Sequence, residues 1–188
     1  MRIIAGTAGG RTLVAPKGLN TRPTQDYVRE SLFNIIRRDV TGANVLDLFA
    51  GSGALGLEAI SRGAEHAVFS DQARQAVDCI RRNAEAMGFL QQVKVIRGDW
   101  RSILQKLEKQ EFDLVFLDPP YRLTRYRDIT NLLAEKLLLS SNALIIIEHR
   151  KDVIIELSPL FTLQDTRIYG DTGMHFYRYA AGGNDFGQ

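Results

Sequence analysis

The sequence of 188 residues predicts an α/β fold: a mostly parallel sheet with helices on both faces and an antiparallel C-terminal hairpin. From residue 44 onward, short apolar runs alternate with amphipathic stretches, which indicates crossover connections between parallel strands. A glycine-rich segment follows the first of these runs, as in doubly wound sheets. The last two runs are joined by a short turn at residues 170–173, so they are expected to pair as a hairpin.

The first 41 residues are expected to form a basic arm that packs on the core. Residues 2–5 and 11–14 predict a short hairpin, and a helix follows in which Thr24 is placed as the cap. Val28, Leu32 and Ile35 with Ile36 recur at helical spacing and predict its buried face. The arm carries seven Lys and Arg against three acids, which gives it a net charge of +4. Since the whole chain has a net charge of +2, the remaining residues have a net charge of −2. This asymmetry suggests a polyanion partner, and the alternative is an ordinary solvated surface.

The elements after the arm follow from the same patterns. Strands buried on both faces are expected at residues 45–49, 67–70, 93–96, 114–117 and 144–147. Helices are expected at residues 54–61, 72–87, 102–109 and 127–138, and the hairpin strands at 163–169 and 174–179. Residues 42–180 thus form one domain, and residues 181–188 are expected to be disordered.

Composition excludes several classes of protein. The longest apolar run, residues 143–147, is far short of the ~20 residues that cross a bilayer. Cys79 is the only cysteine, which rules out an intramolecular disulfide and a cysteine metal cluster. The histidines have no motif spacing, so no metal is expected. We therefore expect a cytoplasmic protein that makes no membrane contact, with a monomer as the default state.

The glycine-rich segment predicts a nucleotide-type ligand site, because ligands of doubly wound sheets lie at the carboxyl ends of the strands. Gly51, Gly53 and Gly56 form a G-x-G-x-x-G pattern, and Asp71 follows where a carboxylate can accept from a ribose. That pattern alone fits a nicotinamide dinucleotide. Asp47, just before the loop, disfavours a pyrophosphate and suits a cationic ligand such as S-adenosylmethionine. Both cofactors remain open on these residues.

Asp99 and Trp100 follow the third run. Asp99 is placed to accept from the exocyclic amine of an adenine, and Trp100 to cover its ring. The alternative for Asp99 is a cap on the helix that begins near residue 102.

The most informative motif is Asp118-Pro119-Pro120-Tyr121, directly after the fourth run. Consecutive prolines cannot extend a strand ladder, so the chain must turn at the carboxyl edge of the sheet. The Asp118 carboxylate and the Pro119 carbonyl are two acceptors for an amino group conjugated to an aromatic ring, and Tyr121 offers a face on which a base stacks. These four residues are predicted to be catalytic in methyl transfer to such an amine. The alternative is a proline-rich turn with a surface tyrosine.

These motifs, in this order, resemble the Rossmann-like (class I) S-adenosylmethionine methyltransferases that modify exocyclic amino groups of bases. Other segments resemble the bacterial small-subunit ribosomal RNA guanine-N2 methyltransferase family. They are Arg2-Ile-Ile-Ala-Gly6, Gly10-Arg11, Arg22-Pro23-Thr24, Arg29-Glu30-x-x-Phe33-Asn34 and Tyr169-Gly170-Asp171-Thr172.

The resemblance implies a seven-stranded sheet, S-adenosylmethionine as donor with S-adenosylhomocysteine as product, and no metal. Its acceptor would be a guanine N2 in 16S ribosomal RNA within a small-subunit particle. Residues 42–180 would be the catalytic domain, with the base held by residues 118–121. The cofactor would contact Asp47, Phe49, Gly51, Gly53, Asp71, Asp99 and Trp100. The family often has Glu where Asp71 stands, and the shorter side chain makes its ribose contacts less certain.

Five arginines are predicted to contact RNA: Arg11, Arg22 and Arg29 on the arm, and Arg122 and Arg125 just past the catalytic turn. For Arg22 and Arg29 the prediction is that they contact RNA phosphate or line the mouth of the active site. The alternative for these residues is a surface or intramolecular ion pair, for example Arg29 with a carboxylate at the sheet edge.

Three other functions are compatible with parts of the sequence. A DNA adenine-N6 or cytosine-N4 amino methyltransferase also uses Asp-Pro-Pro-Tyr, but this chain has no insertion large enough for a DNA recognition domain. An NAD-dependent oxidoreductase would leave Asp47 and the Pro-Pro turn unexplained. A non-enzymatic RNA-binding assembly factor would not need the carboxylates.

Overall fold

The computed structural model describes residues 1–16, 23–107, 110–120 and 125–180, with the backbone alone at 23–25. The expected Thr24 cap was wrong, because the helix begins at Pro23 and Thr24 lies within it. The expected disorder of residues 181–188 concerns residues outside this description. The helices are α1 (Pro23–Ile35), α2 (Arg37–Val40), α3 (Ala54–Ser61), α4 (Arg74–Met87), α5 (Trp100–Lys106) and α6 (Tyr126–Glu135). The strands are β1 (Asn44–Asp47), β2 (His66–Asp71), β3 (Val93–Arg97), β4 (Phe112–Leu117), β5 (Leu139–Arg150), β6 (Phe161–Tyr169) and β7 (Thr172–Tyr179).

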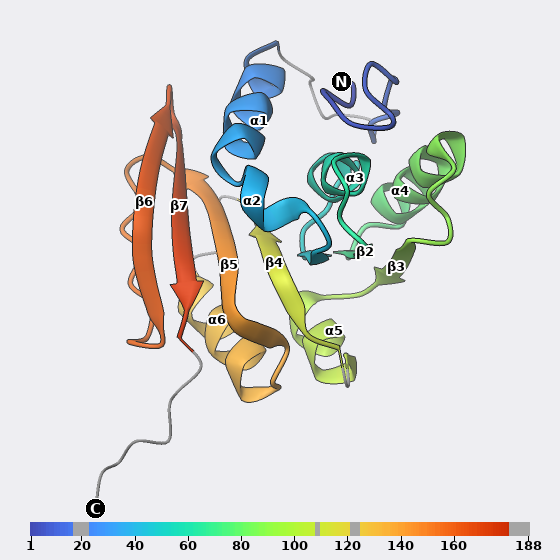
Figure 1. Ribbon diagram of the computed structural model, residues 1–188. Coiled ribbons are helices and arrows are strands. Elements are labelled where there is room, and N and C mark those ends of the chain that lie inside the picture. The colour runs from blue at the N-terminus through green and yellow to red at the C-terminus, as the bar shows by residue number, and fades with distance from the viewer. Residues whose placement is uncertain (17–22, 108–109, 121–124, 181–188) are drawn as a thin grey trace, which may run out of the picture.

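The strands form one seven-stranded sheet in the order β3-β2-β1-β4-β5-β7-β6 (Figure 1). Strands β1 to β5 are parallel, whereas β7 is antiparallel to both β5 and β6. The strand order reverses beside β1, where β4 pairs on the side opposite β2. The predicted mixed sheet and its C-terminal hairpin are therefore confirmed. A reversal of this kind is where a doubly wound sheet opens a crevice for a ligand.

Helices cover both faces of the sheet. On one face, α1, α3 and α4 pack Phe33, Leu57 and Ile80 against strand residues such as Phe116. On the other face, α5 and α6 pack their apolar sides against the alternate residues of the same strands (Figure 1). Because successive side chains of a strand point to opposite faces, burial of both sets explains the uninterrupted apolar runs.

Three further expected details were wrong. Strand β3 is not buried on both faces: it is an edge strand whose residues are half-buried or exposed. Strand β5 is much longer than the expected residues 144–147, because it continues along β7 as far as the pair Arg150 and Thr172. Ile35 is 41% exposed, and Ile36 alone takes the buried position at that turn.

The N-terminal arm is anchored to α3 by a buried carboxylate. The arm forms a single β-bridge between Arg2 and Thr12. Glu58, completely buried on α3, accepts hydrogen bonds from the backbone amides of Ile4 at 2.7 Å and Ala5 at 3.0 Å. It also accepts from Arg62 Nε at 2.6 Å. An acid in the middle of a helix thus fixes the course of the arm.

A second anchor joins the arm to the loop after β1. Asn83, buried on α4, accepts from the Val14 amide at 2.9 Å and donates to the Val14 carbonyl at 2.9 Å. Its amide nitrogen also donates to the Ser52 carbonyl at 3.0 Å. Cys79, expected in the core, is buried beside this contact, and its thiol donates to the Val14 carbonyl at 2.8 Å. Asn83 therefore links the arm to the glycine-rich loop.

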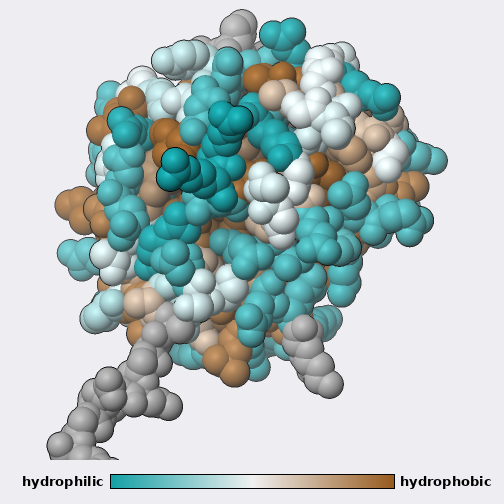
Figure 2. Space-filling view, viewed as in Figure 1, coloured by the Kyte–Doolittle hydropathy of each residue, from teal (hydrophilic) through white to brown (hydrophobic). Residues whose placement is uncertain are grey.

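The surface is mixed in polarity. Figure 2 shows hydrophilic side chains over most of one face, with apolar residues in scattered patches. Among the described helices, none has the length and apolar character that a membrane span requires.

We expect Glu58→Ala to lower the free energy of unfolding by about 3 kcal/mol, because the change leaves buried amides and an arginine without their acceptor. Urea denaturation would measure the loss, and limited proteolysis would show faster cleavage within the arm. Glu65→Ala, an exposed acid after the same helix, is the matched control. Equal stability of the two variants would contradict the role assigned to Glu58.

Candidate active site

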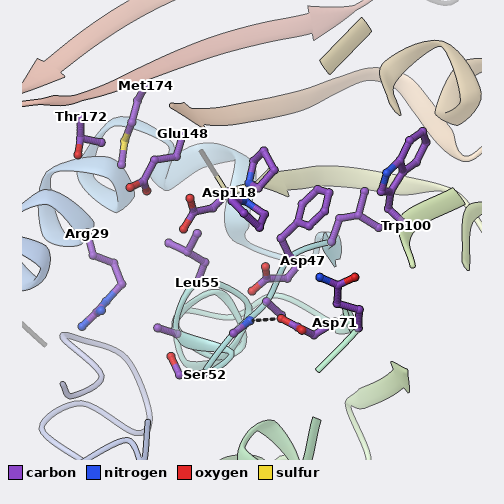
Figure 3. A pocket seen from close by; sticks show the side chains of 18 of the residues that line it. Arg29, Asp47, Ser52, Leu55, Asp71, Trp100, Asp118, Glu148, Thr172 and Met174 are labelled. Atoms are coloured by element: carbon purple, nitrogen blue, oxygen red, sulfur yellow. Dashed lines mark hydrogen bonds between the residues drawn. The ribbon is translucent and has the colours of Figure 1, made fainter. Parts of the chain in front are cut away.

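A cavity of about 830 Å³ opens at the carboxyl ends of β1, β4 and β5 (Figure 3). This volume lies within the usual range of ligand pockets, ~300–1,000 Å³. Of the residues predicted to form the site, nine line it: Asp47, Phe49, Gly51, Asp71, Asp99, Trp100, Asp118, Pro119 and Pro120. Met1 and Arg29 also line it, so the N-terminal arm and α1 contribute one wall.

The glycine-rich loop begins α3 with two left-handed residues. Gly51 has φ 53° and Gly53 has φ 79°, conformations that side chains disfavour. Gly53 precedes the first turn of α3, behind the cavity wall, and a Cβ there would lie 3.2 Å from Ile80. A Cβ on Gly56 would lie 2.3 Å from the Phe69 ring, so this glycine lets α3 pack on β2. The loop thus exposes backbone to the cavity at Gly51.

Asp47, at the end of β1, is 2% exposed. Its Oδ2 accepts from the Gly56 amide at 3.0 Å, which ties the strand end to α3. The pKa of Asp47 is raised to about 7, mainly by burial. The hydrogen bond from Gly56 opposes this shift, and the charges of Asp118 and Asp71 contribute to it. A positive ligand charge beside Asp47 would stabilise its ionised form.

Asp71 holds the glycine loop in place. Its Oδ2 accepts from the Gly51 amide at 3.0 Å (dashed in Figure 3), and its Oδ1 accepts from the Ala73 amide at 2.8 Å. Both oxygens thus have a backbone donor while the side chain faces the cavity. The ribose contact expected of Asp71 stays a prediction.

Asp99 caps α5, as the alternative interpretation held. Its Oδ1 accepts from the backbone amides of Arg101 at 3.1 Å and Ser102 at 3.2 Å. Hydrogen bonds from Ser102 hold the pKa of Asp99 below its ordinary value. Trp100 also lines the cavity, and the Arg101 guanidinium lies 4.9 Å from the centre of its ring. The capping role does not exclude the predicted adenine contact, since Asp99 also lines the cavity.

Asp118 follows the last residue of β4 and opens onto the cavity, with Pro119 and Pro120 beside it. Asp118 is exposed to the cavity, but neighbouring protein atoms partly desolvate its carboxylate, which raises the pKa of Asp118 to about 6. Tyr121, the fourth predicted catalytic residue, lies outside the described residues.

Glu148, near the end of β5, is a cavity residue that the sequence analysis did not select. Figure 3 shows its carboxylate near that of Asp118, with both side chains extending into the cavity. Burial, and next the charge of Asp118, raise the pKa of Glu148 to about 8. The sequence could have indicated Glu148 in one way only: it is an acid that follows an apolar run, as Asp47, Asp71 and Asp118 do at the ends of their own strands.

His149 points to the opposite face of β5. Its ring is 4.4 Å from that of His175, and a Cβ on Gly173 would lie 2.5 Å from it. His149 is 3% exposed, so its role is in packing, as expected.

The arginines predicted to contact RNA occupy different environments. Arg29 is 5% exposed and lies 3.1 Å from Asp26 and 3.8 Å from Glu58. It therefore forms the intramolecular ion pair of the alternative interpretation, although its partners lie on helices and not at the sheet edge. Arg11 is exposed and donates to the Ala86 carbonyl at the end of α4 at 2.6 Å. Arg125 is exposed and lies 3.7 Å from Asp128. Arg22 and Arg122 lie outside the described residues.

The cavity suits a cationic organic ligand. Asp47, Asp118 and Glu148 all have raised pKa values, so a positive ligand would relieve their mutual repulsion. Arg29, the arginine that lines the cavity, already has two carboxylate neighbours. Among the described residues, no three His, Cys, Asp or Glu side chains are grouped to hold a metal ion. A pyrophosphate would meet like charges here, whereas the ammonium and sulfonium of S-adenosylmethionine fit.

The sheet order, the glycine loop and the acidic edge define a Rossmann-like class I S-adenosylmethionine-dependent methyltransferase. A model of the family described as conserved hypothetical protein 95 matches residues 1–178, and the chain belongs to this family.

Individual relatives agree with this assignment. YlbH of Bacillus subtilis is 38% identical over 95% of this chain and 98% of its own. Ribosomal RNA small subunit methyltransferase D of Haemophilus influenzae is 35% identical over 95% of this chain and 92% of its own. The solved structure of yhhF from Escherichia coli, 32% identical, has a TM-score of 0.86 and covers 97% of this chain and 99% of its own. The resemblance found in the motifs is confirmed.

The raised pKa values predict how stability changes with pH. A carboxyl group whose pKa is higher in the folded chain stabilises it most when protonated, so this contribution is lost as pH rises toward about 8. Glu148→Gln cannot ionise at this position. We expect its stability to fall less than that of the wild type between about pH 5 and about pH 8, as thermal unfolding without ligand would show. Parallel pH profiles for the two proteins would contradict the assigned burial of Glu148.

Proposed function

We propose that this chain methylates the exocyclic N2 amine of a guanine in 16S ribosomal RNA, with S-adenosylmethionine as donor. The observation that carries the proposal is the group of carboxylates around Asp118, beside the Pro-Pro turn at the end of β4. The relative named ribosomal RNA small subunit methyltransferase D supports the RNA class. The guanine N2 specificity rests on the motif resemblance.

The cofactor half of the site is proposed to lie along β1, β2 and β3. S-adenosylmethionine, when bound, supplies an electrophilic methyl group on its sulfonium. Asp47 would face the positive part of the ligand, and the backbone of Gly51 would allow close approach. Asp71, Asp99 and Trp100, at the ends of the next two strands, would hold the ribose and adenine.

The base half is proposed to centre on Asp118 and Pro119, with Tyr121 stacking on the ring. The Asp118 carboxylate and the Pro119 carbonyl would accept from the amine hydrogens, which aims the nitrogen lone pair at the methyl group. The nitrogen–carbon bond forms as the carbon–sulfur bond breaks, and the nitrogen becomes cationic. Asp118 then accepts the proton that the amine loses. No covalent bond to the protein is needed.

The RNA itself is proposed to supply much of the specificity. A guanine must leave its helix to bring N2 into the cavity. Arg11, Arg22, Arg122 and Arg125 are proposed to contact phosphates, while Arg29 shapes the cavity wall from α1. The chain would act as a cytoplasmic monomer on a folded small-subunit particle. Equal methylation of a short unstructured oligonucleotide would contradict this part.

We expect Asp118→Ala to reduce methylation at least about 10²-fold, because it removes an acceptor that acts on the reacting amine. Binding of S-adenosylmethionine should change little, since the cofactor is assigned mainly to the preceding strands. Activity on small subunits and calorimetry with the cofactor would measure both. Glu111→Ala, an exposed acid before the same strand, is the control. Normal turnover by the Asp118 variant would refute its assigned role.

Deleting the gene tests the function in cells. We expect ribosomal RNA from the deletion strain to lack one N2-methylguanosine of the small subunit, which mass spectrometry of nuclease fragments would locate. An unchanged methylguanosine profile would refute the proposal. Loss of methyladenine or methylcytosine from DNA instead would favour the DNA amino methyltransferase.

A further inference from the structure

Glu148 and Asp118 are brought side by side by the pairing of β4 with β5. The register places Leu117 opposite Ile147, so the next residue of each strand, Asp118 and Glu148, lies at the same level of the sheet. Leu117 and Ile147 pack on the face covered by α5 and α6. Because side chains alternate between faces, Asp118 and Glu148 both point to the other face, into the cavity.

Two neighbouring carboxylates distinguish bases by the atom next to the exocyclic amine. Guanine has an N–H at N1 beside its N2 amine, so its edge offers adjacent donors, one for each carboxylate. Adenine and cytosine have a bare nitrogen lone pair beside the amine. This lone pair would face a carboxylate oxygen once the bound cationic cofactor has shifted both acids to their ionised forms. A buried acceptor without a donor is costly, and sites built around a required hydrogen bond reject analogues that lack it by ~10⁴-fold or more.

We propose that Glu148 is the residue that selects guanine, by accepting the N1–H of the base while Asp118 accepts from the N2 amine. The role rests on the proposed function, since it concerns the base bound at the same turn. The Glu148 carboxylate forms no hydrogen bond or ion pair with the described residues, and its strand neighbour, Met174 on β7, carries no charge.

The test uses 2-aminopurine, which keeps the reacting amine at C2 but has a bare N1 and no O6 carbonyl. The loss of O6 is the same for every variant, so a change of preference between variants reports on the N1 contact. Small subunits are reconstituted with 16S ribosomal RNA in which the methylated guanosine is replaced by 2-aminopurine through ligation. The values of kcat/KM on both particles are compared for the wild type, Glu148→Gln and Glu156→Gln. Glu156 is exposed and undergoes the same chemical change outside the cavity.

The wild type and Glu156→Gln are expected to prefer guanine at least about 10³-fold. Glu148→Gln presents an amide that donates to a bare N1 as readily as it accepts from N1–H. Its preference should therefore fall by at least about 10²-fold. The unfolding midpoint checks that the variant is folded.

Two results would overturn the inference alone: equal methylation of both particles by the wild type, or an undiminished preference in folded Glu148→Gln. If the wild type methylates no guanine in either particle, the proposed function fails and the role of Glu148 fails with it. Equal methylation of both particles by the wild type would refute the role of Glu148 even where Glu148→Gln does not fold.

Discussion

The site depends on one constraint: carboxylates at the ends of three neighbouring parallel strands must share a single cavity. Asp47, Asp118 and Glu148 come from β1, β4 and β5, which are consecutive in the sheet. Desolvation raises the pKa of each group, and repulsion from neighbouring carboxylates adds to the shift at Asp47 and Glu148, so the ligand-free cavity favours protons and cations. A positive sulfonium and a base with adjacent N–H donors would both interact favourably with these carboxylates. In the proposed function, the same three carboxylates thus favour both the cofactor and the acceptor base.

The N-terminal arm supports this arrangement from outside the sheet. Glu58 fixes the arm to α3, and Asn83 joins Val14 of the arm to the carbonyl of Ser52 in the glycine loop. The arm therefore contacts the loop that is proposed to bind the cofactor, and Met1 and Arg29 line the same cavity. Part of the positive charge of the arm is used for this internal contact, because Arg29 lies between buried or half-buried acids. The remaining basic residues of the arm are the ones available to a polyanion.

The sequence predicted the sheet, its hairpin and most of the cavity because these follow from local patterns. Asp47 and Asp118 stand in motifs at strand ends, where a doubly wound sheet binds ligands. Glu148 was missed because its meaning depends on the register between β4 and β5, which no local pattern records. The ion pair between Arg29 and Glu58 could not be predicted, because the two residues lie on different helices. From the sequence alone, Glu58 has the appearance of an ordinary surface residue of a helix. The exposed face of β3 follows from its position at the sheet edge, which the order of strands in sequence does not reveal.

The most direct test of this electrostatic account is the proton balance of cofactor binding. Calorimetric titration with S-adenosylmethionine at about pH 6.5, in buffers of different ionisation enthalpy, measures protons exchanged per cofactor bound. Asp47, Asp118 and Glu148 have pKa values near or above that pH, so binding of a cation should ionise them and release protons. Proton release that diminishes in Glu148→Gln is the predicted result. Binding without proton exchange, or with proton uptake, would contradict the account.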